Sequence, residues 1–451
     1  MYKLFGTDGI RAVAGKSPLD YSTVYALGKA LTFLLKEEGL EPRVIIGRDT
    51  RESGEWLEQV LSQGINQSNG ETVSSGIVPT SAISFLINKY SFSAGVVISA
   101  SHNPYQDNGI KVFSSQGVKI SNEWERKLEK AITVTSENAT REEVKLNPNS
   151  SLGQDYMDFL KSQHSHLHLK KRIKVILDCS NGASSFFAPQ ILRDLGFEVF
   201  ALSNTPDGTN INDRCGSLYP QNLAEKVVEY NADIGVAYDG DADRAIWVDE
   251  KGRILNGDHT LFVLSRFMKE RGHLKSDSIV GTIMSNMGLE KALEKLDLRL
   301  IRTQVGDKYV LEQMKKLKTN LGGEQSGHTI FLDECPTGDG ILTSLKMLEA
   351  IVTHDIPLSR LVEDFEEFPQ VLVNVPVQRK ENFNQFPEIV DTIEKVQHRL
   401  GDSGRMNVRN SGTEPKVRIM IEGQDRKKIE EYAHQIAKVI EKYLGKNKEI
   451  Y

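Results

Sequence analysis

Short apolar runs alternate with longer amphipathic stretches along most of the chain. The runs have the length and the Val and Ile content of buried strands, and they lie at residues 44–46, 96–98, 174–177, 233–238, 245–248, 279–280 and 300–301. Between the runs, apolar side chains recur at helical spacing, as they do from Leu19 to Leu35 and over residues 342–352. Strands that alternate with helices predict α/β units built on parallel, doubly wound sheets.

The alternation is interrupted at three places, which divide the chain. Residues 136–152 are polar, and a new unit begins near Lys251. Beyond Phe368 the order changes to strand, helix, strand, strand, helix, with strands of antiparallel type at residues 371–373 and 417–421. The sequence therefore predicts three α/β domains, at residues 1–150, 151–250 and 251–367, followed by an α+β domain at residues 368–451.

The apolar run at residues 96–98 ends abruptly in polar residues. Ser99, Ser101, His102 and Asn103 follow it, and Pro104 stops the strand pattern. A serine just past the end of a buried strand lies where open α/β sheets bind ligands. Turn serines that only cap backbone groups are commoner than nucleophilic serines, so this stretch alone favours a simple turn.

An acidic loop separates the runs at residues 233–238 and 245–248. In extended backbone, the side chains of Asp239, Asp241 and Asp243 face the same way and converge on one cation. Oxygen ligands select a hard ion such as Mg²⁺, or Ca²⁺ in a larger site. An EF-hand would use Glu250 as well, but Arg244 stands where its turn needs glycine and the flanks are strands. A solvated acidic loop without metal is the remaining alternative.

Residues 322–328 form a glycine-rich loop that contains Glu324, Ser326 and His328. Glycines let the backbone approach a ligand closely, Glu324 can accept protons from sugar hydroxyls, and His328 can shuttle a proton near neutral pH. A plain turn fits this stretch equally well.

Residues 409–416 combine an arginine, hydroxyls and a turn, which together suit the oxygens of a phosphate. In a strand, Arg418 shares a face with Lys416. A hairpin turn with a salt-bridged surface is the alternative.

Composition narrows the classes of function. The 451 residues are 39% hydrophobic and 26% charged, as in ordinary globular proteins, and the formal net charge is −6. No Lys- or Arg-dense block indicates a nucleic-acid partner, no apolar run approaches a membrane span, and the first residues lack the apolar core of a signal peptide. Cys179, Cys215 and Cys335 are far apart and odd in number, which indicates free thiols in a reducing cytoplasm.

Six motifs, taken together and in order, resemble the phosphohexomutase superfamily over nearly the whole chain. They lie at residues 5–11, 98–104, 239–244, 305–307, 323–328 and 411–415. Gln325 and the opening at residues 5–9 are similar to the glucosamine branch of that superfamily. The resemblance implies three α/β domains followed by a smaller α+β domain around a central cleft.

The resemblance also implies roles for individual residues. Ser101 would be a phosphoserine, and Asp239, Asp241 and Asp243 would hold one Mg²⁺ per active site together with an oxygen of that phosphoserine. The residues around the reacting groups would be Arg11, His102, Lys111, Arg244 and His328, with Lys111 or His328 as the proton carrier. The sugar would be held by Gly306, Asp307, Glu324 and Ser326. The phosphate that is not reacting would be held by Arg409, Asn410, Ser411, Gly412, Thr413 and Arg418.

The activity that the resemblance implies is the interconversion of glucosamine 6-phosphate and glucosamine 1-phosphate, which feeds synthesis of UDP-N-acetylglucosamine and cell-wall precursors. Glucosamine 1,6-bisphosphate would be both intermediate and activator, and the partner would be a small hexosamine phosphate. Mutases of glucose or mannose phosphates are alternatives, as are an Mg²⁺-dependent sugar phosphatase and a non-catalytic sugar-phosphate sensor. The oligomeric state is open, with a homodimer among the alternatives.

Three positions depart from the pattern of the superfamily. Ala12 stands where glycine is usual, Asn410 where proline is usual, and Lys308 where arginine is usual. The lysine cannot supply the bidentate fork of an arginine. None of these positions is the proposed nucleophile or a proposed metal ligand.

Overall fold

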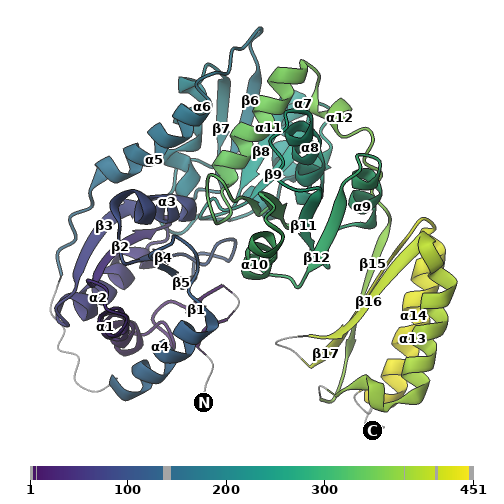
Figure 1. Ribbon diagram of the computed structural model, residues 1–451, viewed down its shortest axis with the longest axis horizontal. Helices are drawn as coiled ribbons and strands as arrows, with labels where there is room; N and C mark the ends of the chain where they lie inside the picture. The colour runs from purple at the N-terminus through teal and green to yellow at the C-terminus, as the bar shows by residue number, and fades with distance from the viewer. Residues whose placement is uncertain (1–3, 7, 136–143, 380, 412–414, 446–451) are drawn as a thin grey trace. The chain divides into compact units, whose positions relative to one another are not determined.

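The structure is a computed structural model, and it describes residues 4–6, 8–135, 144–379, 381–411 and 415–445 (Figure 1). The chain packs into two compact units. The first consists of Met1–Thr282 and Ile301–Glu363, and the second of Ile283–Leu300 and Asp364–Tyr451. The division into four domains at residues 150, 250 and 367 stays a prediction of the sequence.

The first sheet has the strand order β1-β5-β4-β2-β3. Its strands are β1 (Ile10–Val13), β2 (Arg43–Arg48), β3 (Glu71–Ile77), β4 (Ala94–Ile98) and β5 (Asp107–Ser114). Strands β2, β3 and β4 are parallel, whereas β5 runs antiparallel to both β4 and β1. One face packs against α1 (Tyr21–Glu37), α2 (Ser53–Asn66) and α4 (Asn122–Thr135), and the other packs against α3 (Thr80–Tyr90) (Figure 1).

Local signals near this sheet were partly misread. Residues 107–109 have the sequence Asp-Asn-Gly, which is typical of tight turns, but they form the start of β5. Gly109 lets the strand approach Ser99, because a Cβ on Gly109 would lie 2.5 Å from the Ser99 carbonyl oxygen. The apolar stretches at residues 110–113 and 118–120 do form a short hairpin: Phe113 pairs with Lys119 in an antiparallel bridge, and the amides of Ser114 and Ile120 donate to the carbonyl oxygens of Val118 and Val112. Ser17 followed by Pro18 is typical of a helix start, but helix α1 begins at Tyr21, with Asp20 as the N-cap that accepts from the Thr23 amide.

The second sheet has the order β10-β9-β8-β6-β7. Its strands are β6 (Lys174–Asp178), β7 (Glu198–Leu202), β8 (Ile234–Tyr238), β9 (Ala245–Asp249) and β10 (Ile254–Leu255), and the neighbouring helices are α5 (Ser150–Gln163), α6 (Ala188–Asp194) and α7 (Gln221–Glu229). Strands β6, β7 and β8 are parallel, and β9 is antiparallel to β8.

The third sheet has the order β12-β11-β13-β14. Its strands are β11 (Ser278–Thr282), β12 (Arg299–Thr303), β13 (Leu321–Gly323) and β14 (Thr329–Phe331). The helices of this part of the sequence are α8 (Gly257–Glu270), α9 (Met287–Glu294), α10 (Asp307–Leu317), α11 (Gly340–His354) and α12 (Leu358–Leu361). Short 3₁₀ helices lie at Ala183–Phe186, Gly216–Leu218, Phe383–Gln385 and Gly401–Ser403.

The three sheets are mixed, although the sequence predicted parallel ones. Residues 239–244 alone join β8 to β9, and residues 324–328 alone join β13 to β14. A parallel connection needs a crossover of a dozen or more residues, so strands joined this closely pair antiparallel. The predicted α/β class with a final α+β segment is confirmed.

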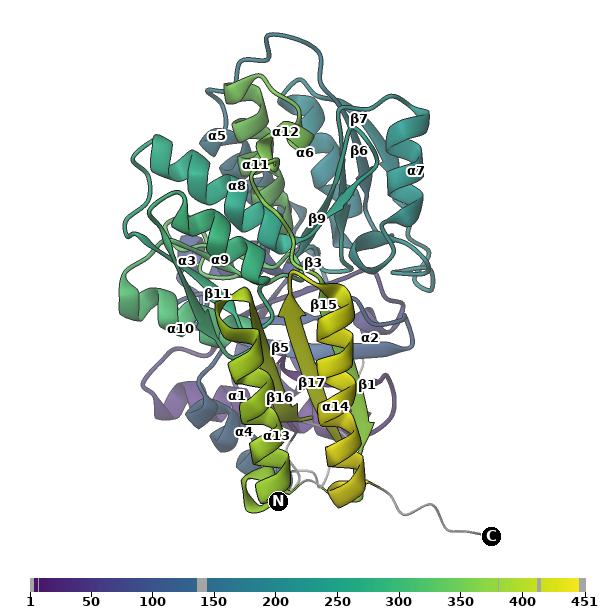
Figure 2. The ribbon, with the colours of Figure 1, turned by 90° about the vertical axis from the view of Figure 1, so that its right-hand side faces the viewer.

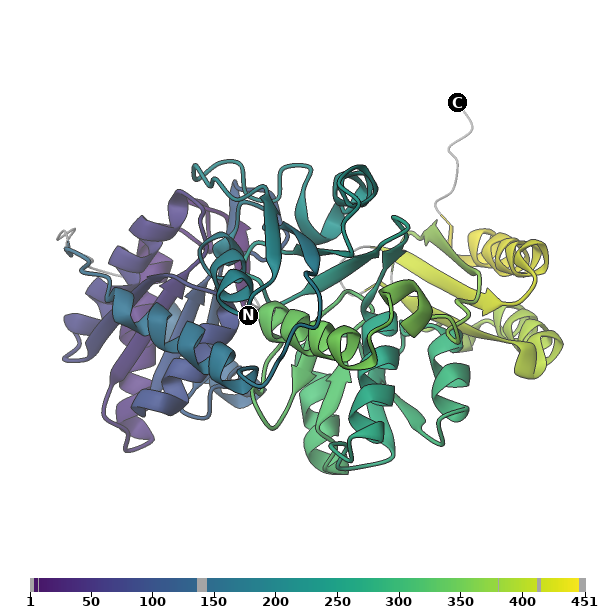
Figure 3. The same ribbon diagram turned by 90° about the horizontal axis from the view of Figure 1, so that it is seen from above.

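The final segment has the predicted order of strand, helix, strand, strand, helix. It consists of β15 (Gln370–Pro376), α13 (Pro387–Leu400), β16 (Gly404–Asn410), β17 (Lys416–Gly423) and α14 (Arg426–Leu444). The sheet order is β15-β17-β16, with antiparallel pairs throughout. Helices α13 and α14 cover the same face of this sheet (Figures 2 and 3).

Two predictions about composition can be compared with the structure. Among the described residues, no helix combines the length and the apolar content that crossing a lipid bilayer requires. Cys179, Cys215 and Cys335 are free, as the sequence predicted, and the structure shows that all three are buried.

Candidate functional site

Ser101 lies just beyond the carboxyl end of β4 and is almost fully buried, with 1% of its surface exposed. Its Oγ donates a hydrogen bond of 2.5 Å to Oδ2 of Asp239 and lies 3.2 Å from Nδ1 of His102. Its backbone adopts a left-handed conformation with φ of 54°, which a residue with a side chain adopts only when its surroundings hold it there. The serine predicted to be the nucleophile therefore faces the predicted metal loop.

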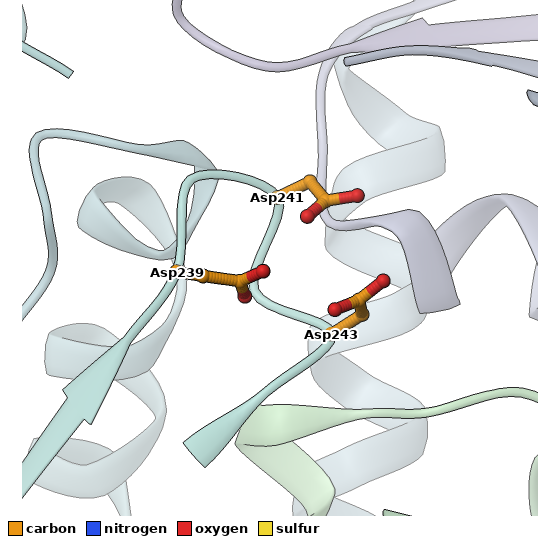
Figure 4. Close-up of side chains that lie close together, drawn as sticks. All are labelled: Asp239, Asp241 and Asp243. Carbon is orange, nitrogen blue, oxygen red and sulfur yellow. The ribbon is translucent and has the colours of Figure 1, made fainter. Parts of the chain in front are cut away.

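The three aspartates of that loop converge on one point, as Figure 4 shows. Asp239, Asp241 and Asp243 follow β8, they are buried, and one carboxylate oxygen from each lies within 4.8 Å of the others. The loop is a turn and not the extended segment that the sequence suggested, because Ala242 has φ of 58° and its amide donates to the Asp239 carbonyl oxygen. Gly240 brings this turn against the serine: a Cβ there would lie 2.6 Å from the Ser101 carbonyl oxygen.

Positive charges face the aspartates. Nζ of Lys111, whose residue is 2% exposed, lies 2.6 Å from Oδ2 of Asp241 and 3.1 Å from Oδ2 of Asp243. Nε of Arg244 lies 3.7 Å from Oδ1 of Asp243 and 3.9 Å from Oδ2 of Asp239. Thr80, at the start of α3, donates its hydroxyl hydrogen to Oδ2 of Asp241 at 2.5 Å.

The titration of these groups follows from burial and charge. Burial raises the pKa of the Asp239 carboxyl group well above its usual range, and the charges on Asp243 and Asp241 add to this. Burial acts in the same direction on Asp243, but the Lys111 ammonium and the other cations nearby together outweigh it and hold the pKa of Asp243 below its usual range. Burial also opposes the charge on Lys111, yet Asp241 and Asp243 raise its pKa. Burial lowers the pKa of His102 to about 4, aided by Arg244 and Arg11.

The aspartates fit a hard cation. Oδ1 of Asp241 and Oδ1 of Asp243 are buried and have no hydrogen-bond partner among the described residues. Buried carboxylate oxygens without a donor are costly unless a cation faces them, and a set of oxygens suits Mg²⁺. The EF-hand alternative does not fit, because strands flank the loop and Glu250 accepts from the amide of Ser359 instead.

A network of charges joins the motif at residues 5–11 to the glycine-rich loop at residues 322–328, which we call the sugar loop. Nζ of Lys119 lies 3.0 Å from Oδ1 of Asp8 and 2.8 Å from Oδ2 of Asp307. Nη2 of Arg11 lies 3.4 Å from Oδ2 of Asp8, and Nε2 of His328 lies 3.8 Å from Oδ2 of Asp307. Burial by itself raises the pKa of Asp8 and Asp307, but Lys119 and the other cations nearby together outweigh it and hold both pKa values below their usual range. Residues from three of the six motifs thus lie within one connected set of contacts.

The sugar loop connects β13 to β14. The amide of Gly306 donates to Oε1 of Glu324 at 2.9 Å, and a single β-bridge joins His328 to Arg244. Both ring nitrogens of His328 are buried and lack a hydrogen-bond partner within the described part of the chain. Ser326 has an exposed side chain. Glu324, His328, Gly306 and Asp307 therefore come together, with Ser326 at the surface of the loop.

In the second compact unit, Arg409 on β16 lies directly opposite Arg418 on β17. Directly opposed residues of an antiparallel pair project from the same face, where two like charges repel each other and an anion between them would be stabilising. The amide of Ser411 donates to the Lys416 carbonyl oxygen at 2.8 Å, and Asn410 donates to that of Glu381. Gly412 and Thr413 lie outside the described residues.

The three departures from the superfamily pattern occupy ordinary positions. Ala12 is paired with Asn108 inside β1 and β5. Asn410 ends β16. Nζ of Lys308 donates to Oδ1 of Asn122 at 2.6 Å and lies 4.0 Å from Glu125, so this lysine joins α10 to α4.

Sequence reasoning missed several residues that hold this site together. Thr80 and Lys119 carried no signal, because their contacts depend on how separate segments pack. Arg51 and Asp49 did carry one: they follow β2, so they lie at the same sheet edge as Ser101. Asn212, from a loop of the second sheet, donates to the carbonyl oxygen of Ser101 at 2.9 Å.

Comparisons with known proteins agree with this arrangement. Family models described as phosphoglucomutase/phosphomannomutase alpha/beta/alpha domains I, II and III and C-terminal domain match residues 2–139, 154–252, 256–368 and 372–439. A phosphoglucosamine mutase of Koribacter versatilis is 44% identical over 452 residues, which cover 98% of this chain and 97% of that one. A phosphoglucosamine mutase of Bdellovibrio bacteriovorus is 44% identical over 457 residues, covering 98% and 99%.

A solved structure shares the fold. The phosphoglucomutase/phosphomannomutase family protein of Burkholderia thailandensis superimposes with a TM-score of 0.81 at 21% identity, covering 98% of this chain and 97% of that one. The resemblance to the phosphohexomutases found in the motifs is thereby confirmed. The chain belongs to the phosphoglucomutase/phosphomannomutase family, and its relatives of 44% identity within that family are phosphoglucosamine mutases.

Proposed function

We propose that this chain is an intramolecular phosphotransferase that interconverts glucosamine 6-phosphate and glucosamine 1-phosphate. The observation that carries the proposal is the hydrogen bond from Oγ of Ser101 to Asp239, within a buried group of three carboxylates. The sugar is inferred from the phosphoglucosamine mutases that are 44% identical over nearly the whole chain.

Ser101 carries the phosphoryl group when the substrate arrives. O1 of glucosamine 6-phosphate attacks the phosphorus, the O1–P bond forms as the P–Oγ bond breaks, and the hydroxyl proton of O1 passes to a side-chain base. The product of this half is glucosamine 1,6-bisphosphate. After that molecule turns over, Oγ of Ser101 attacks the phosphorus of the 6-phosphate, the P–Oγ bond forms as the P–O6 bond breaks, O6 takes back the proton from the side-chain base, and glucosamine 1-phosphate leaves. Added glucosamine 1,6-bisphosphate would act as an activator, because it would transfer a phosphoryl group to unphosphorylated Ser101.

Lys111 and His328 would have different roles around the reacting groups, one as a charged hydrogen-bond donor and the other as a proton acceptor. Because Asp241 and Asp243 raise its pKa, Lys111 stays an ammonium at neutral pH and provides charge and hydrogen-bond donors. His328 has two buried ring nitrogens without a hydrogen-bond partner among the described residues, and it is the better candidate to accept the proton of the sugar hydroxyl. Arg11, Arg244 and His102 would neutralise and orient the transferring group.

Asp239, Asp241 and Asp243 would hold Mg²⁺ together with an oxygen of phosphorylated Ser101. When bound, the ion supplies positive charge against the oxygens of the transferring phosphoryl group. The three carboxylates and Ser101 are buried, which keeps water from competing with the sugar hydroxyl.

Two further sets of residues would hold the substrate. Glu324, Ser326, Gly306 and Asp307 would bind the sugar. The opposed arginines Arg409 and Arg418, with Asn410, Ser411, Gly412 and Thr413, would bind the phosphate that is not reacting. The reaction would take place in the cytoplasm on a small hexosamine phosphate, where the three buried thiols stay reduced.

A side-by-side assay tests the proposal. The 6-phosphates of glucosamine, glucose and mannose are offered with Mg²⁺ and a trace of bisphosphate, and both sugar 1-phosphate and inorganic phosphate are measured. Glucosamine 6-phosphate should give the highest kcat/KM with little inorganic phosphate. Faster turnover of glucose or mannose phosphate would reassign the sugar, stoichiometric phosphate release would indicate a phosphatase, and binding without turnover would indicate a sensor.

A further inference from the structure

Arg51 is a fully buried arginine that the proposed chemistry does not use. It follows β2, only 1% of its surface is exposed, and it lies beneath the loop that carries Ser101. Its Nε donates to Oδ2 of Asp49 at 2.9 Å, and the Asp49 carboxylate is buried as well. A buried guanidinium is costly unless all of its donors are satisfied.

All five N–H donors of Arg51 have a partner. Besides the bond from Nε, its two terminal nitrogens donate to backbone carbonyl oxygens of the loop that begins at Ser101. Nη1 donates at 2.5 Å to Pro104 and at 2.9 Å to Asp107, and Nη2 donates at 3.0 Å to Ser101 and at 2.8 Å to Asn103. The planar fork of an arginine matches this set of acceptors, whereas a lysine offers three donors from one nitrogen.

Other groups support the same loop from both sides. Nδ2 of Asn212 donates to the carbonyl oxygens of Ser101 and Asn103, at 2.9 and 3.0 Å, so these two carbonyls are each held twice. Asp49 accepts from the hydroxyl of Ser99 at 2.6 Å, and that hydroxyl accepts from the amide of Ser101 at 2.9 Å. The left-handed backbone of Ser101 is thus determined by contacts to its amide and its carbonyl.

We propose that Arg51 is the positioning residue that holds Oγ of Ser101 toward Asp239 by fixing the carbonyls of residues 101–107, an inference that rests on the proposed function. Arg51 acts through the loop backbone and contacts neither the carboxylates of the metal loop nor the sugar loop in any described hydrogen bond or ion pair. Ser101 must present its oxygen at one place in both transfer steps, including while the bisphosphate turns over. A displacement of about 1 Å at a reacting atom costs about 100-fold in rate.

The test compares Arg51→Met and Arg51→Lys with a matched control, Arg48→Met. Arg48 is the last residue of β2, three positions before Arg51, and its Nε donates to the buried carboxylate of Glu58 at 3.0 Å. Arg51→Met should lower kcat about 100-fold and leave KM for glucosamine 6-phosphate within about 2-fold, because the sugar loop is untouched. Arg51→Lys should fall between Arg51→Met and the wild type. Arg48→Met should melt earlier but keep the wild-type kcat per folded molecule.

Hydrogen exchange gives a readout that does not depend on turnover. Amides of residues 99–107 should exchange faster in Arg51→Met than in the wild type and in Arg48→Met. If the wild-type chain shows no mutase activity, the proposed function fails, while the exchange data still test whether Arg51 fixes the backbone of the loop that carries Ser101. If Arg51→Met does not fold, Arg51→Lys and Asn212→Ala, which removes two bonds to the same carbonyls, take its place. Wild-type kcat, or wild-type exchange at residues 99–107, in these folded variants would overturn the proposal.

Discussion

Oγ of Ser101 donates a hydrogen bond of 2.5 Å to Oδ2 of Asp239, although the two residues are 138 positions apart in the chain. Ser101 follows β4 of the first sheet and Asp239 follows β8 of the second, so the contact joins the carboxyl ends of two central strands. Such strand ends are where open α/β sheets place their ligands. The contact gives the serine a partner that would also hold a cation beside a phosphoryl group.

Ser101→Ala should abolish mutase turnover, with kcat lower by more than about 10⁴-fold, because the oxygen that accepts and returns the phosphoryl group is gone. Intact mass measured after incubation with bisphosphate should show one added phosphoryl group in the wild type and none in the variant. Ser115→Ala, at an exposed turn, is the control and should keep both activity and phosphorylation. A Ser101→Ala enzyme of near wild-type rate would refute the assignment.

Removal of divalent metal should silence the enzyme, and Mg²⁺ should restore it. Asp241→Asn and Asp243→Asn each remove a carboxylate that faces the proposed ion, and each should cost more than about 100-fold in kcat/KM, since even groups behind metal ligands account for 10–100-fold. Titration calorimetry with Mg²⁺ would measure the matching loss of affinity. The exposed Asp355→Asn should behave as wild type in both measurements, and full activity in a chelated enzyme would contradict the metal site.

The fold was predictable where a short apolar run was flanked by clear helical periodicity. Strand direction was not, because the apolar pattern of a buried strand is the same in parallel and antiparallel sheets. The antiparallel pairing of β8 and β9 follows only from the shortness of the connection between them, residues 239–244, once both elements are known to be strands of one sheet. Strand β1 was missed because its sequence, Ile10–Val13, has only one buried residue and reads as a loop.

The candidate site was predictable to the extent that each motif follows a strand. Ser101 and the three aspartates could be proposed from local sequence, and the structure brings them together. The contacts of Lys111 with Asp241, 130 positions away, and of Thr80 with Asp241, 161 positions away, depend on the packing of two sheets. No local pattern contains that information. The resemblance placed Lys111 near the reacting groups, but its contact with Asp241, and the part played by Thr80, emerge only from the structure.

Lys111 stabilises the aspartates in the absence of metal, which leads to a third prediction. Lys111→Met leaves two buried carboxylates without their ammonium partner, and it should lower the free energy of unfolding by about 3–5 kcal/mol. Mg²⁺ at 100 times its dissociation constant binds the folded state and should return about 2.7 kcal/mol. Chemical denaturation with and without Mg²⁺ measures both quantities.

The control for Lys111→Met is Lys346→Met, which breaks the ion pair with Glu334. In that pair, Nζ of Lys346 lies 2.6 Å from Oε1 of Glu334, and the two side chains are 20% and 22% exposed. The pair does not involve any of the three aspartates. Its loss should cost less stability, and Mg²⁺ should stabilise the variant by the same amount as the wild type. Equal stability of Lys111→Met and wild type without metal would contradict the role of Lys111.

His259, on α8, makes the folded state sensitive to acid. Burial lowers its pKa from 6.5 to about 3, and the guanidinium of Arg253 contributes. Its Nδ1 donates to Oδ1 of Asn256 at 3.1 Å, so the neutral ring is well placed in the N-terminal turn of the helix. Below pH 6.5 His259 is protonated in the unfolded chain but stays neutral in the folded chain. The free energy of unfolding is therefore not reduced by His259 above that pH, and it falls as the pH drops toward 3.

His259→Gln should remove this part of the acid sensitivity while keeping a donor for Asn256. Each pH unit corresponds to about 1.4 kcal/mol, so between pH 7 and pH 5 the wild type should lose about 2 kcal/mol more of its unfolding free energy than the variant. Urea denaturation at both pH values, in chelated buffer, measures the difference. His168→Gln, at an exposed histidine, should follow the wild-type curve, and parallel losses in wild type and His259→Gln would show that the buried ring does not set the acid limit of this fold.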